Sequence, residues 1–230
     1  MALRLEAIAR RVGAEVHLHP TDLELPRGSL TVLLGPTLAG KTTLLRLMAG
    51  LDRPDAGRVF MDGAEVTNLP VRRRRVAMVY QQFINYPTLS VFENIASPLR
   101  VARTPRAAIE TKVREAARLL RLEPFLERTP RELSGGQQQR TAIARALVKD
   151  ADLVLMDEPL ANLDYKLREE LREELPRVFE AAGTVFVYAS TEPAEALMFG
   201  GFVATLHQGR VTQFGRASEV YRRPADLVTA

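Results

Sequence analysis

The chain has no cysteine and no tryptophan, and only three of its 230 residues are histidine. The missing cysteines exclude disulfides, thiolate metal sites and a cysteine nucleophile, although they leave the redox compartment open. No apolar run approaches the roughly 20 residues that cross a bilayer, and the first residues lack the apolar core of a signal peptide. We therefore expect a protein without its own membrane span, which reaches a membrane only through a partner.

The composition is that of an ordinary globular protein, because 46% of the residues are hydrophobic and 26% are charged with both signs interspersed. The length suits one large domain better than two. The net charge of +4 comes mainly from arginine, including the run Arg72–Arg75. This run has two interpretations, a patch for nucleic acid or anionic lipid and a solvated face beside a strand.

Short apolar runs alternate with helical patterns, which predicts an α/β fold with a mainly parallel sheet and crossover helices. The first 34 residues indicate a small antiparallel sheet. We expect one domain over 1–230, in which 1–86 and 150–230 form the core and about 87–149 form a helical subdomain, with breaks at Pro98, Pro105, Pro124 and Pro130. The expected strands are 30–34, 59–61, 76–80, 153–156, 185–188 and 203–206, and the expected helices are 40–50, 162–181 and 193–199.

A glycine-bearing loop lies between the strand 30–34 and the helix that follows it. Its sequence fits G-x-x-x-x-G-K-S/T, which a chain of this length matches by chance about once in a hundred. The loop N–H groups then hold the β- and γ-phosphates of ATP, Lys41 neutralises charge, the Thr42 hydroxyl ligates Mg²⁺, and Thr43 helps with the α-phosphate. The loop consists of Gly35, Pro36, Thr37, Leu38, Ala39, Gly40, Lys41 and Thr42.

An acidic pair, Asp157 and Glu158, follows the apolar run 153–156. Mg²⁺ prefers oxygen ligands, so a carboxylate at the end of a buried strand completes the metal site. Asp157 then holds the water shell of the metal, and Glu158 acts as the general base that polarises the attacking water. Taken alone, the same pair also fits the N-terminal cap of a helix. Together with the phosphate loop, the pair predicts a magnesium site.

The segment Leu133–Arg140 reads LSGGQQQR and resembles the signature motif of the ABC (ATP-binding cassette) family of P-loop ATPases. In that family two cassettes pack head to tail, and the signature of one caps the γ-phosphate held by the other. The resemblance places Ser134, Gly135, Gly136 and Gln137 in this role. A glycine pair that opens a helix offers N–H groups to an anion, whereas an ordinary cap explains Ser134 but not the glycines.

The resemblance spans nearly the whole chain and implies further roles. Gln81 is similar to the glutamine that senses Mg²⁺ and the attacking water, and Asn162–Asp164 is similar to the D-loop, with Asp164 at the dimer interface. The segment 87–94 resembles the surface that receives a helix from the membrane subunits of importers. The partners that the family resemblance implies are two transmembrane permease subunits and, indirectly, a substrate-binding protein, and no nucleic acid is expected. The resemblance also implies a peripheral location on the cytoplasmic face of the membrane.

Three positions depart from the family pattern. Thr191 replaces the switch histidine, and the loss of one such transition-state contact lowers the rate by roughly 10²- to 10³-fold. Val12 replaces the aromatic residue that stacks on adenine. Leu38 occupies a position that is usually glycine, and it adds roughly 1–2 kcal/mol of strain if the loop needs a positive φ there.

These departures stand beside a complete signature, so the resemblance implies the catalytically weaker half of an asymmetric cassette pair. The tail from Gln208 onward is similar to the carbohydrate and glycerol importer branch, and the changed segments resemble ATP-binding subunits of bacterial glycerol importers. We therefore expect import of a small polyol or sugar, with glycerol favoured. The alternatives are an ABC ATPase associated with DNA or ribosomes, and a structural subunit that binds ATP without hydrolysis.

Overall fold

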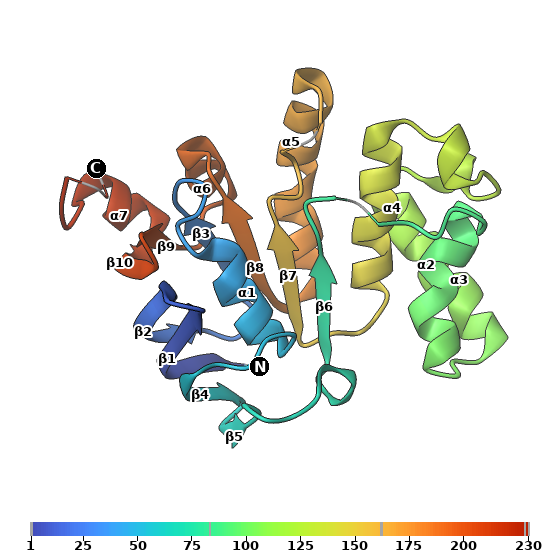
Figure 1. The fold of residues 1–230 in the computed structure, drawn as a ribbon. Helices are drawn as coiled ribbons and strands as arrows, with labels where there is room; N and C mark the ends of the chain where they lie inside the picture. Colours follow the sequence, from blue (N-terminus) through green and yellow to red (C-terminus); the bar gives the residue numbers. More distant parts are fainter. Residues whose placement is uncertain (1, 83, 162, 228, 230) are drawn as a thin grey trace.

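Two sheets form the framework of the chain in a computed structural model that describes residues 2–229 apart from 83, 162 and 228 (Figure 1). The larger sheet has the strand order β10-β9-β3-β8-β7-β6, in which β10 is antiparallel to β9 and the other pairs are parallel. Its strands are β3 (Leu30–Leu34), β6 (Val76–Val79), β7 (Leu153–Asp157), β8 (Val185–Ser190), β9 (Phe202–His207) and β10 (Arg210–Arg216). The predicted α/β architecture with a mixed or parallel core is confirmed.

The central strands consist mostly of apolar residues because both faces of this sheet are covered. Leu155 and Val187 belong to one core with the helix α1 (Lys41–Ala49) and the smaller sheet, whereas Val154 and Phe186 belong to a second core with the helix α5 (Tyr165–Ala182). Successive residues therefore alternate between two cores, and this alternation fixes the register of each strand. Two shorter helices follow β8 and β10 in the chain: α6 (Pro193–Phe199) and α7 (Ala217–Arg222).

The smaller sheet is antiparallel, as predicted, but it includes more of the chain than the first 34 residues. Its order is β2-β1-β4-β5. The turn Asp62–Gly63 joins β4 to β5 within this sheet. β4 also pairs with β1, which is distant from it in sequence. The strands are β1 (Leu3–Val12), β2 (Glu15–Leu25), β4 (Ala56–Met61) and β5 (Ala64–Glu65).

Helices fill the segment between β6 and β7 and lie beside the β6 edge of the larger sheet (Figure 1). They are α2 (Val91–Val101), α3 (Arg106–Leu119) and α4 (Gly135–Leu147), with short 3₁₀ turns at 123–125 and 130–132. The expected break at Pro98 is wrong, since α2 continues through it. Proline cannot donate to the carbonyl of Asn94, and the Ser97 hydroxyl donates to that oxygen instead at 2.8 Å. The division into a core and a helical subdomain stays a prediction.

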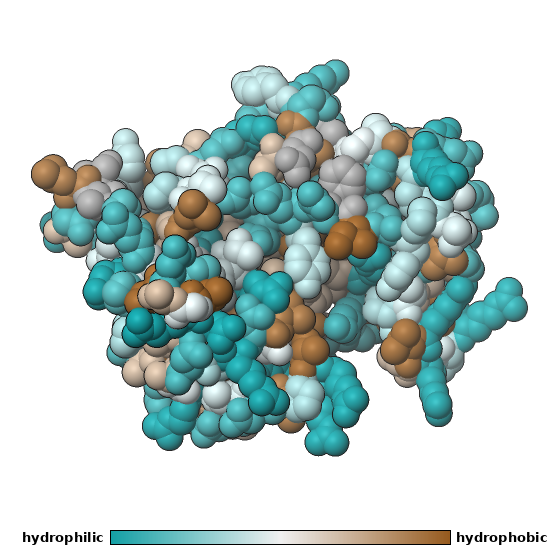
Figure 2. Space-filling view, viewed as in Figure 1, coloured by the Kyte–Doolittle hydropathy of each residue, from teal (hydrophilic) through white to brown (hydrophobic). Residues whose placement is uncertain are grey.

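The molecular surface in the view of Figure 1 is mostly hydrophilic, with scattered hydrophobic residues (Figure 2). Within the described part of the chain, no helix combines the length and the hydropathy that a bilayer span requires.

The arginine run is partly structural. Arg74 is buried and its guanidinium donates to the carbonyls of Met48, Val66, Thr67 and Leu69 at 2.5–3.1 Å. Burial lowers the pKa of this guanidinium. Arg74 thereby ties the end of α1 to the segment that follows β5, which neither interpretation of the run anticipated.

We predict that Arg74→Met lowers the free energy of unfolding by about 3 kcal/mol, because several buried carbonyls lose their donor. The matched control is Arg73→Met, which changes an exposed neighbour in the same run. Urea denaturation of the two variants measures the difference. Equal midpoints for both would contradict the structural role of Arg74.

Candidate functional site

The phosphate-type loop follows β3 and ends at α1, as the pattern predicts. A side chain at Gly35 would place its Cβ 2.2 Å from the Leu206 carbonyl oxygen, so only glycine fits there. Gly40 has a φ of +103° directly before α1. The turn between β9 and β10 also contacts the loop, since the Gly209 N–H donates to the Ala39 carbonyl at 2.9 Å. The sequence analysis missed Gly209, although the dipeptide Gln208-Gly209 between two apolar runs indicates a turn.

Leu38 lies in this loop with a φ of +67° and is 96% exposed. The condition under which leucine strains the loop is therefore met, at roughly 1–2 kcal/mol. Its side chain has no core to pack against. The strain is a property of the loop itself.

Lys41 is buried, with 4% of its side chain exposed, and its ammonium group lies among oxygen atoms. It donates to the carbonyls of Gly35 and Pro36 at 2.8 and 2.9 Å and forms an ion pair with Glu158 at 3.1 Å. The single cation of the loop is thus held inside the curve of the backbone, where a phosphate oxygen would find it. This arrangement fits a polyanionic ligand.

Thr42 and Asp157 come from α1 and β7 and meet at the same edge, with the hydroxyl donating to the carboxylate at 3.0 Å. Burial raises the pKa of Asp157 above its usual value, while the Thr42 hydrogen bond and the charge of Lys41 act in the opposite direction. Thr42 itself is exposed. These two oxygen groups fit a Mg²⁺ ion.

Glu158 directly follows β7 with a φ of +44°, and its N–H donates to the Ala189 carbonyl at 3.1 Å. The reading of the acidic pair as a helix cap is wrong, because the next helix, α5, begins only at Tyr165. The carboxylate is 19% exposed and faces Lys41. Its position at the mouth of the loop suits a general base.

The signature segment lies at the start of α4. Ser134 caps this helix, since its Oγ accepts from the Gln137 N–H at 3.4 Å and the Gln137 side chain accepts from the Ser134 N–H at 3.0 Å. Ser134 and Gly135 are exposed, whereas Gly136 is buried. The strands β6 and β7 separate α4 from α1 (Figure 1). One chain therefore does not bring the signature segment to its own phosphate loop.

The remaining candidates come from several elements of the two sheets. Val12 ends β1 and is 51% exposed, Gln81 follows β6, and Thr191 follows β8. Asp164 precedes α5 and is exposed, as are Gln81 and Thr191. Asn162 of the same motif lies outside the described residues. The functional roles of these side chains, and that of Thr43, stay predictions.

Residues 18–161 match the family model described as ABC transporter. The sn-glycerol-3-phosphate import ATP-binding protein UgpC of Pectobacterium atrosepticum is 40% identical over 229 residues, which cover 99% of this chain and 64% of that protein. The spermidine/putrescine import ATP-binding protein PotA of Shigella boydii is 43% identical over 209 residues, which cover 91% of this chain and 55% of that protein. This chain thus spans less than two thirds of either relative.

A solved dimer of the ATP-binding cassette MJ0796, in a post-hydrolysis state bound to ADP and Pi, has the same fold. It is 29% identical, with a TM-score of 0.81, over 94% of this chain and 98% of that one. This likeness confirms the predicted fold class.

We predict that Asp157→Asn stabilises the nucleotide-free and metal-free chain at neutral pH. The folded-state pKa of Asp157 lies above its unfolded value, so its contribution to stability falls as the pH rises between the two values and remains unfavourable above them. Asparagine removes this charge and still accepts the Thr42 hydrogen bond. Thermal unfolding from pH 3.5 to 8 should show a higher melting temperature for Asp157→Asn than for the wild type at neutral pH, and this difference should disappear in acid. The control is Asp152→Asn, at the other end of β7, and an equal gain there would refute the prediction.

Proposed function

This chain belongs to the ABC transporter family, and on that premise we propose that it binds ATP with Mg²⁺ and hydrolyses it to power an importer. The observation that carries the proposal is the meeting of Lys41, Thr42, Asp157 and Glu158 at one edge of the sheet. A cation, a pair of metal-type oxygens and a partly exposed carboxylate are the groups that ATP hydrolysis requires.

Each group has a defined task in this proposal. The loop N–H groups and the start of α1 bind the phosphates, and Lys41 turns from the Gly35 and Pro36 carbonyls toward them. Thr42 and Asp157 hold Mg²⁺, which supplies charge neutralisation when it is bound. Glu158 accepts the proton of the attacking water.

The site is completed by a second cassette. The exposed Ser134 and Gly135 at the start of α4 lie away from the loop of their own chain, which supports a head-to-tail dimer in which they cap the γ-phosphate of the other chain. We propose a partner that differs from this chain. The departures at Val12, Leu38 and Thr191 weaken only the pocket built on this chain's own loop.

The assembly proposed around the pair consists of two permease subunits in the membrane and a substrate-binding protein, with this chain peripheral on the cytoplasmic face. The two relatives are named for the import of different substrates: sn-glycerol-3-phosphate for UgpC, and spermidine and putrescine for PotA. Our proposal of a small polyol or sugar, with glycerol favoured, rests on the resemblance of the segments around Leu38, Ile84 and Thr191. A role on DNA or ribosomes has less support. It would use the arginine run, in which Arg74 already donates its hydrogen bonds to backbone carbonyls.

We predict that Lys41→Ala weakens Mg-ATP binding by about 10- to 100-fold, since the phosphates lose a charged hydrogen-bond donor. Titration calorimetry with the purified chain measures the affinity. Glu158→Gln is the matched variant, because it also removes the Lys41 ion pair but should preserve binding and lower turnover by about 10²- to 10⁴-fold. Unchanged affinity in Lys41→Ala would sink the site assignment, and unchanged turnover in Glu158→Gln would remove Glu158 from the mechanism.

A further prediction concerns the division of labour in the assembled transporter. Ser134→Arg should lower ATPase activity more than Lys41→Ala does, because it damages the site on the partner's loop, where the switch histidine is expected. Both variants are compared in the reconstituted complex. A larger loss from Lys41→Ala would mean that this chain's own pocket is the productive one.

A further inference from the structure

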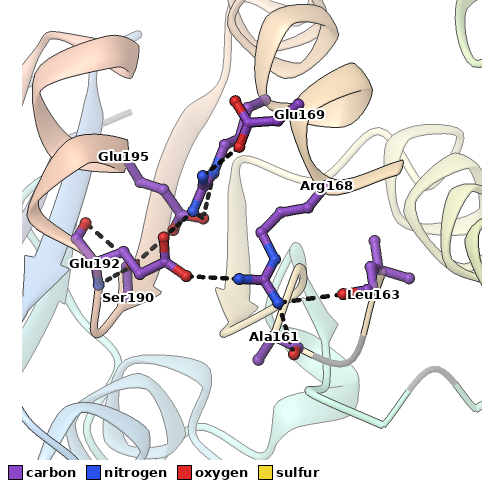
Figure 3. Close-up of polar contacts among 8 residues, drawn as sticks. Ala161, Leu163, Arg168, Glu169, Ser190, Glu192 and Glu195 are labelled. Carbon is purple, nitrogen blue, oxygen red and sulfur yellow. Dashed lines mark hydrogen bonds and ion pairs between the residues drawn. The ribbon is translucent and has the colours of Figure 1, made fainter. Parts of the chain in front are cut away.

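A cluster of arginines and carboxylates joins the first turns of α5 to the segment that follows β8 (Figure 3). The segment after β8 carries Thr191, and the segment before α5 leads back to Glu158. Neither the sequence pattern nor the proposed chemistry accounts for this cluster.

Arg172 forms the fixed part of the cluster. It is buried and forms ion pairs with Glu169 at 2.6 Å, with Glu195 at 3.0 Å, and with Glu192. Burial acts against its charge, but the hydrogen bonds that it donates to Glu192, Glu195 and Glu169 raise its pKa overall. The second oxygen of Glu195 accepts from the Ser190 hydroxyl at 2.5 Å. Arg172 therefore anchors α6 and the end of β8 to α5.

Arg168 makes a different kind of contact, because its guanidinium bridges a side-chain carboxylate of one segment and the backbone carbonyls of another. One nitrogen donates to Glu192 at 2.9 Å, and another donates to the carbonyls of Leu163 at 3.1 Å and Ala161 at 3.4 Å (Figure 3). Glu192 is held in turn, since its N–H donates to the Ser190 hydroxyl at 2.9 Å.

The two bridged segments carry the groups that flank the reaction centre. The β7–β8 ladder ends at the pair Asp157–Ala189, and the Glu158 N–H makes one more bond to Ala189. Beyond that point the segments part around a cavity of about 20 Å³ lined by Glu158, Ala161 and Thr191 among others. This space suits a single water molecule. Its width depends on the separation that Arg168 spans.

We propose that Arg168 is a positioning residue, which sets the spacing between the Glu158 segment and the Thr191 segment during ATP hydrolysis. This proposal rests on the proposed function. A guanidinium can hold a carboxylate and two carbonyls at once through its planar set of donors, whereas a lysine ammonium lacks that fork. Arg168 touches no reacting atom, so its effect passes through the two segments.

The kinetic test compares Arg168→Ala, Arg168→Lys and Arg177→Ala by the ATP hydrolysis of the purified chain, in which every pocket is built on this chain's own loop. Arg177 is an exposed arginine on the same helix. We expect Arg168→Ala to lower kcat by about 10- to 100-fold with KM for ATP changed less than twofold, because misplaced groups slow the chemical step. Arg168→Lys should fall between, and Arg177→Ala should match the wild type. A rise in KM without a fall in kcat would overturn the proposal.

A second measurement needs no activity. Hydrogen–deuterium exchange of the nucleotide-free chain should increase in both 158–164 and 189–192 in Arg168→Ala, and Glu192→Gln should add little to that increase in the double variant. Faster exchange in one segment alone, or additive effects, would overturn the bridge. Failure of the wild-type chain to bind Mg-ATP in calorimetry would overturn the proposed function instead, so the two failures are distinguishable.

Discussion

The parallel pairing of β8 with both β3 and β7 is the constraint on which the site depends. Leu34 lies opposite Ser190, and Asp157 lies opposite Ala189, so the three strands end at nearly the same level. The phosphate loop, the acidic pair and the Thr191 segment therefore leave the sheet side by side. A shift of one residue in either ladder would turn Asp157 away from Thr42 and exchange the two cores.

The charges of Lys41 and Glu158 neutralise each other at this edge before any nucleotide binds. Lys41 is shared by two loop carbonyls and Glu158, and Asp157 is buried beside Thr42. In the proposed function, a bound phosphate would compete for the ammonium of Lys41 and would release the Glu158 carboxylate for contact with water. The proposal therefore links nucleotide binding to activation of Glu158 through a single cation, because the phosphate and the carboxylate would compete for Lys41.

The local parts of this arrangement could be predicted from the sequence. The run 30–34, the loop pattern and Gly50 define β3 and α1 almost to the residue, since each signal lies within a few neighbours. The missed features arise from contacts distant in sequence. The pairing of β4 with β1, the burial of Arg74 under α1 and the Arg168 bridge leave no periodic trace. Pro98 lies between these two classes. The Ser97 hydroxyl replaces the hydrogen bond that Pro98 cannot donate, and Ser97 is adjacent in sequence, but its role is recognisable only once the helix is known.

The geometry also explains why an unequal pair is a reasonable proposal. A head-to-tail dimer contains two composite sites, each with the loop of one chain and the signature of the other. In this chain the departures lie on the loop side, at Val12, Leu38 and Thr191, whereas Ser134 and Gln137 form a complete capping box at the start of α4. In the proposed pair, changes on the loop side would therefore weaken the site on this chain's loop and spare the site on the partner's loop.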